Sequence, residues 1–316
     1  MSRKLFFLLL SFTAQFPIWP QAQSDPPPRR GHALAYDAGL RRIVLFGGEA
    51  RTGLLNDTWF WNGKHWTQAH PAASPASPDP PDRCSTVYYS ARSQLLLLCD
   101  IERGTWLWKG DTWTLITPPV RLAGGVTAYD AGLRQIVVFG GGGGNKAPVD
   151  DTWTWDGSNW MQKLPATRPP AMAGAAIAYD SVRARVVVFG ETDGATWLWD
   201  GVNWERKSPA HSPPKRSRYG IAYDQAQSQV VLFGGENGPG QYLSDTWVWD
   251  GTDWRQKLPA RTPPARSGHS LAYDAGTQEV VLFGGETAPN GALLNDTWVW
   301  DGANWSIRTA VDQGGK

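Results

Sequence analysis

One unit, repeated six times, makes up most of this chain of 316 residues. Each unit has a short segment ending in tyrosine, a small loop, an apolar run, a Thr-Trp-x-Trp segment and one more tryptophan. The recurring tyrosines lie 40 to 53 residues apart, at Tyr36, Tyr89, Tyr129, Tyr179, Tyr223 and Tyr273. Repetition at this period is typical of folds in which copies of one supersecondary unit stack and bury a shared core. The repeat therefore constrains the fold more than length or composition does.

Each unit is expected to form four short antiparallel strands, A to D. The apolar run, such as Ile43–Phe46, suits strand B, and an Asp-Gly pair such as Asp156-Gly157 suits the C–D turn because glycine accepts positive φ. Four-stranded units that stack face to face around an axis form a propeller, whose closure leaves only short protected edges. We therefore predict an all-β, six-bladed β-propeller with repeats at about 27–67, 80–116, 117–161, 168–204, 213–254 and 263–306.

Eighteen of the nineteen tryptophans fall three to a repeat, for example Trp59, Trp61 and Trp66. Trp59 and Trp61 lie two apart on an expected strand, so both face one side of it. Many tryptophans could also form a carbohydrate platform, but their regular placement favours packing against the next blade.

The apolar run, a double glycine and two tryptophans with six residues between them resemble the kelch repeat. The tryptophan pairs are Trp59/Trp66, Trp106/Trp113, Trp153/Trp160, Trp197/Trp204, Trp247/Trp254 and Trp298/Trp305. Repeats two and four depart from the pattern, with Asp100-Ile101 and Gly190-Glu191 in place of the double glycine. Gly-His and Trp-Asp pairs also occur in WD40 repeats, but the double glycine and the second tryptophan favour kelch. The resemblance covers Pro27–Ser306 and implies the same propeller fold.

The first residues predict export. A basic start precedes an apolar run from Leu5 to Leu10, and the small residues Ala22 and Ser24 suit a cleavage site. This is the pattern of a secretory signal peptide, too short to span a bilayer. We expect residues 1–24 to be removed and residues 25–316 to form a single propeller domain, secreted or periplasmic, with no membrane span.

Only two cysteines are present, Cys84 and Cys99, both in the second repeat. They fall on strands expected to be adjacent and antiparallel, and an oxidising compartment permits a disulfide between them. The alternative is two small buried apolar side chains. The formal charge of +1 argues against nucleic acid, which requires a clustered basic surface.

The binding face is predicted from loop lengths. The B–C loops and the D–A links between blades emerge on one face, here called the B–C/D–A face, and the B–C segments vary in length while the turns on the opposite face do not. Repeats one, five and six, which ring closure makes neighbours, share polar residues near this face. The candidate ligand-binding residues are Arg29, His32, Glu49, Arg216, Tyr219, Glu236, Arg266, His269 and Glu286.

The kelch resemblance implies ligand-facing roles for Arg29, Arg216 and Arg266, which we expect to converge with the three glutamates. Alternatively, the arginines only pair with the glutamate after the double glycine or bind backbone carbonyls. At the same positions repeats three and four carry Leu122 and Met172.

Function follows less directly than fold, because kelch propellers include both enzymes and binding modules. We favour a secreted, monomeric binding or interaction module for a protein or a small anionic or carbohydrate ligand, with no cofactor and no metal. If the chain is an enzyme, a periplasmic sugar isomerase or mutarotase resembling the sialic-acid kelch enzymes is favoured over a copper radical oxidase. The oxidase would need a Tyr–Cys crosslink beside two histidines, whereas both cysteines lie in repeat two and His32 and His269 lie in repeats one and six.

Overall fold

The computed structural model describes residues 25–76, 84–99, 104–116, 124–142, 147–172, 175–191, 193–288 and 291–308. The predicted signal peptide, Leu122 and Asp100-Ile101 lie outside these ranges. The described residues form strands, bridges and turns and contain no helix, so none of them forms a helical membrane span.

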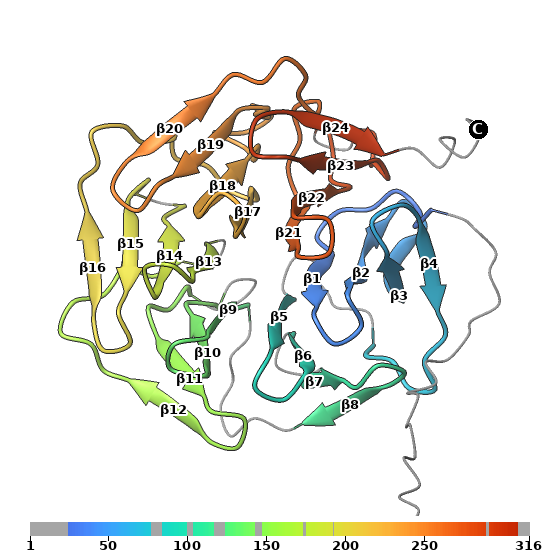
Figure 1. Cartoon of the computed structure of the whole chain (residues 1–316), viewed down its shortest axis with the longest axis horizontal. Helices are drawn as coiled ribbons and strands as arrows, with labels where there is room; N and C mark the ends of the chain where they lie inside the picture. Colours follow the sequence, from blue (N-terminus) through green and yellow to red (C-terminus); the bar gives the residue numbers. More distant parts are fainter. Residues whose placement is uncertain are drawn as a thin grey trace, which may run out of the picture.

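Six four-stranded antiparallel sheets form a ring around a central axis (Figure 1), each sheet from four consecutive strands. The innermost strands, A, are β1 (Ala33–Asp37), β5 (Ser85–Tyr89), β9 (Val126–Asp130), β13 (Ala176–Asp180), β17 (Gly220–Asp224) and β21 (Ser270–Asp274). The B strands are β2 (Arg42–Ala50), β6 (Gln94–Leu98), β10 (Gln135–Phe139), β14 (Arg185–Phe189), β18 (Gln229–Phe233) and β22 (Glu279–Phe283). The predicted six-bladed all-β propeller is therefore confirmed.

The outer half of each blade is built from the tryptophan-rich segments. The C strands are β3 (Gly53–Trp61), β7 (Thr105–Trp108), β11 (Thr152–Trp155), β15 (Thr196–Trp199), β19 (Thr246–Trp249) and β23 (Thr297–Trp300). The D strands are β4 (Trp66–Ala69), β8 (Trp113–Ile116), β12 (Trp160–Lys163), β16 (Trp204–Lys207), β20 (Trp254–Lys257) and β24 (Trp305–Arg308).

The B strands form the centre of the core. Ile43–Phe46 and its counterparts are buried on both faces, because a neighbouring blade covers each side of the sheet. The C–D turns follow from their sequence. In the third blade Asp156 Oδ1 accepts the backbone N–H groups of Ser158 and Asn159, and Gly157 takes a φ of +93°. Such an aspartate-led turn needs glycine at the left-handed position.

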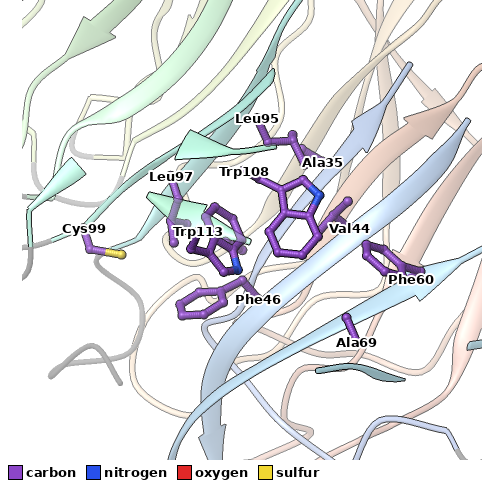
Figure 2. Packing of buried hydrophobic residues seen from close by; sticks show 11 residues of the cluster. Ala35, Val44, Phe46, Phe60, Ala69, Leu95, Leu97, Cys99, Trp108 and Trp113 are labelled. Carbon is purple, nitrogen blue, oxygen red and sulfur yellow. The ribbon is translucent and has the colours of Figure 1, made fainter. Parts of the chain in front are cut away.

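The tryptophans pack between blades, as predicted, but against the preceding blade rather than the next one. Figure 2 shows Trp108 and Trp113 of the second blade beside Phe46 and Phe60 of the first, with ring centroids 5.4 Å apart for Trp113–Phe46 and 5.8 Å for Trp108–Phe60. All described tryptophans are buried or partly buried, and none is exposed. The same packing joins blade one to blade six, where Trp66 lies 5.0 Å from Phe283.

Of the two alternatives for the cysteines, the structure shows the disulfide. Cys84 and Cys99 are bonded with a Cα–Cα separation of 4.2 Å, one step beyond the Ser85–Leu98 pair of β5 and β6. It joins strands A and B of the second blade at the B–C/D–A face.

Candidate functional site

The three predicted arginines are buried structural residues. Arg29 is fully buried, and its Nη1 and Nη2 donate to the two carboxylate oxygens of Asp57 at 2.7 and 2.8 Å. Its remaining contacts are with backbone carbonyls, Nη1 to Gly47 and Nε to Pro27. Arg216 and Arg266 repeat every one of these contacts, with Asp245, Gly234 and Pro214 and with Asp296, Gly284 and Pro264 respectively.

The expected convergence of these arginines with the glutamates is therefore wrong. The acidic partner of each is the aspartate directly before the Thr-Trp segment of its own blade, and four donor contacts per side chain leave little for a ligand. Burial raises the pKa of Asp296, but the hydrogen bonds and charge of Arg266, with the indole N–H of Trp298, outweigh burial and hold that pKa below its usual range. The expected contacts with backbone carbonyls, in contrast, are present.

His32, Tyr219 and His269 connect neighbouring blades. Each ring lies edge-on against the last phenylalanine of strand B in the preceding blade, with centroids 5.4 to 5.7 Å apart. The Tyr219 hydroxyl donates to the Phe189 carbonyl and accepts the N–H of Ala176. Burial, followed by the charge of a nearby arginine, lowers the pKa of His32 well below its usual range and that of His269 to about 3, so both rings are neutral.

The same three residues line a cavity of about 180 Å³ in the central channel. The innermost strands of all six blades contribute to its wall, including the hydroxyl side chains of Ser85, Thr86, Thr127 and Ser270. None of the described residues that line it is Arg, Lys, Asp or Glu.

Glu49, Glu236 and Glu286 extend strand B beyond the double glycine. The backbone of Glu286 pairs with Ser267 in an antiparallel bridge, and Glu49 and Glu236 pair in the same way with Arg30 and Ser217. The second glycine makes this approach possible: at Gly48, φ is +96° and a Cβ atom would lie 2.7 Å from the Arg30 carbonyl oxygen. These bridges occur in blades one, five and six.

A chain of four charges runs across these three blades. Arg30 donates to Glu49 through Nε at 2.9 Å and to Glu286 through Nη1 at 2.8 Å. Arg218 Nη1 lies 2.9 Å from the other carboxylate oxygen of Glu286. The Glu286 side chain is only 3% exposed, whereas Arg30 and Arg218 are each 29% exposed. One buried carboxylate from blade six therefore fixes two partly exposed arginine side chains, one from blade one and one from blade five.

Arg30 and Arg218 were not among the predicted site residues. Both depart from the repeat: Ser217 and Ser267 stand at the position of Arg30, and Gly31 and Gly268 stand at the position of Arg218. The sequence signal that could have identified Arg30 and Arg218 is that each differs from the residue at the same position in the matching repeats.

Arg218 has an unusual backbone conformation. Seven described non-glycine residues have positive φ, and six of them occupy the same place in the A–B turns of the six blades. The seventh is Arg218, with φ of 53°, where glycine would be expected. Its carbonyl accepts the N–H of Gly268, and the Gly268 carbonyl accepts the N–H of Gly31. Blades five, six and one thus share this conformation, and of these three blades only blade five adopts it with a side chain.

Glu236 and Tyr242 complete the group. Glu236 forms backbone bridges with Ser217 and Tyr242, and its Oε1 accepts the N–H of Gly240. Burial, and then the negative charge of Glu286, raises the pKa of Tyr242. We call Arg30, Glu49, Arg218, Glu236, Tyr242 and Glu286 the mouth cluster. No group of three or more described His, Cys, Asp or Glu side chains is placed to hold a metal ion.

Comparison with known proteins shows mainly the fold. No family model matches the chain. The solved structure of YjhT superposes with a TM-score of 0.63 at 16% identity, over 92% of this chain and 100% of that one. A segment of 72 residues is 33% identical to dynein regulatory complex subunit 7 of Chlamydomonas reinhardtii, and it covers 22% of this chain but only 6% of that protein. The chain is thus a six-bladed propeller with kelch-like blades, similar in fold to YjhT.

Proposed function

We propose that the protein is a secreted binding module whose ligand sits on the B–C/D–A face, over the mouth cluster. The observation that carries the proposal is Arg218. Its backbone position favours glycine, yet it carries a long cationic side chain that is fixed by a buried carboxylate and left partly exposed. Backbone conformations that a side chain disfavours are typical of functional sites.

The arrangement of the mouth cluster supports the same site. Glu286 of blade six forms ion pairs with Arg30 of blade one and Arg218 of blade five. The positions of both arginines are therefore set before a ligand binds. Preorganised polar groups bind a ligand with less loss of side-chain freedom than mobile ones. The B–C hairpin of blade one lies beside this group, where Arg51 Nη2 donates to the Gly291 carbonyl of blade six.

Support for secretion comes from the signal-peptide pattern and from the disulfide. Disulfides persist in oxidising compartments and are uncommon in the cytosol.

The substitution Arg218→Gly tests the proposal, because it gives blade five the residue of blades one and six. Arg134→Gly is the matched control: Arg134 has a φ of 55° but lies in an A–B turn on the opposite face. Ligands would be found by screening the mature protein against sugars, sugar acids and peptides by calorimetry. We expect Arg218→Gly to weaken binding by about tenfold or more, while stability changes by no more than about 1 kcal/mol in both variants. Unchanged affinity in Arg218→Gly would contradict the proposal.

A further inference from the structure

We infer that the ligand of the mouth cluster is an uncharged polyhydroxylated molecule, such as a neutral sugar, rather than an anion. The inference rests on the proposed function and specifies the chemical class of the ligand.

The charges of the mouth cluster are already balanced. Arg30 contacts both Glu49 and Glu286, and Arg218 contacts Glu286, so two guanidinium groups face two carboxylates. Glu236 adds one further negative charge at the edge of the group. An anion would meet no net positive charge here and would be repelled by the exposed carboxylates.

The channel below the mouth offers no charge either. Its cavity is lined by described residues with hydroxyl, imidazole or apolar side chains, and burial keeps both imidazoles neutral. A ligand that extends from the mouth into the channel would therefore leave the charged cluster for an uncharged, partly polar surface.

The cluster still offers directed hydrogen bonds. The Arg218 side chain is partly exposed and its Nε has no hydrogen-bond partner among the described residues, and the side chains of Glu49 and Glu236 are partly exposed. A hydroxyl group both donates and accepts, so it can bridge a guanidinium donor and a carboxylate acceptor that lie near each other. A ring with several hydroxyl groups can make such contacts with several members of the cluster at once. Half-buried Tyr242 adds a side chain with an apolar body and a polar tip, which suits the mixed surface of a sugar.

Matched pairs of sugars test the inference, because glucose and glucuronate, or galactose and galacturonate, differ only in a hydroxymethyl or carboxylate group. Binding to the mature protein would be measured by saturation-transfer NMR and calorimetry, at low ionic strength and at about 0.15 M salt. We expect the neutral member of a pair to bind at least about tenfold more tightly than its acid, with little effect of salt, because the acid meets like charge. Arg218→Gly should remove this binding and Arg134→Gly should preserve it.

Two results would overturn the inference in distinguishable ways. If an acid or an anionic peptide binds more tightly than any neutral sugar, loses affinity with salt and depends on Arg218, the site is real but its ligand is an anion. If every ligand found binds equally well to the wild type and to Arg218→Gly, the proposed site itself is wrong.

Discussion

The indole N–H of Trp66 in the first blade donates to the hydroxyl of Thr297 in the last blade, at 2.9 Å. The equivalent bond occurs at four other junctions, as Trp113–Thr58, Trp204–Thr152, Trp254–Thr196 and Trp305–Thr246. Each sheet uses strands of one repeat only, so no strand bridges the first and last blades. The Trp66–Thr297 bond, with the Trp66–Phe283 contact beside it, is therefore part of what closes the ring.

Thr297→Val should lower the free energy of unfolding by about 1–2 kcal/mol, because it leaves the buried Trp66 indole N–H without an acceptor. Urea unfolding followed by tryptophan fluorescence would measure the change. Thr105→Val is the control, since Thr105 occupies the same place in blade two and its buried Oγ1 has no partner among the described residues. Valine there should be neutral or stabilising. Equal losses in the two variants would show that the bond does not stabilise the ring.

Arg266→Met should destabilise the fold by about 3 kcal/mol, because the half-buried Asp296 carboxylate loses its bidentate partner. Blade four has no ion pair at these two positions. Buried Met172 and Ala195 stand there in place of the arginine and the aspartate and belong to one apolar cluster. The double variant Arg266→Met/Asp296→Ala should recover most of the loss. Denaturant unfolding of the three proteins checks this. A single variant as stable as the wild type would mean that the ion pair contributes nothing.

The sequence predicted the fold, the tryptophan packing between blades and two cysteines within disulfide reach, because each follows from features that repeats share or from short-range pairing. The prediction that the three arginines face a ligand was wrong because it, too, relied on features that the repeats share. Recurrence of Arg29, Arg216 and Arg266 marks a structural contact, and their true partners, such as Asp57, stand 28 to 30 residues away on another strand. The mouth cluster depends on Arg30 and Arg218, where the repeats differ, and only the closed ring brings both to Glu286.

Stability should fall on mild acidification because of His32 and His269. Each has a folded-state pKa below the usual value, so below about pH 6.5 the unfolded chain binds a proton that the folded chain excludes. The free energy of unfolding should then fall by about 1.4 kcal/mol per pH unit for each histidine, down to about pH 3 for His269. The charge of Arg29 near His32 and of Arg266 near His269 adds to the effect of burial, whereas Asp296 partly offsets it at His269.

Urea unfolding between about pH 7.5 and pH 5, for the wild type and for His32→Gln/His269→Gln, isolates this effect. Buried aspartates with a raised pKa, such as Asp224 and Asp274, increase the free energy of unfolding on acidification. They do so equally in the wild type and in the double variant. The double variant should therefore show the shallower loss of stability. Identical pH dependence in the two proteins would exclude the histidines as its source.

Loss of the disulfide should weaken the second blade most directly. Cys84 and Cys99 are 15 residues apart, and closing a loop of this length stabilises a fold by about 3 kcal/mol. The bond lies at the end of the blade where blades one, five and six have a backbone bridge between strand B and the D–A link. Cys84→Ala/Cys99→Ala should therefore unfold at lower urea concentration than the wild type, and reductant should shift the wild type toward the variant without moving the variant itself. Mass spectrometry under non-reducing conditions would count the free thiols, and two free thiols in the mature wild type would show that the bond does not form.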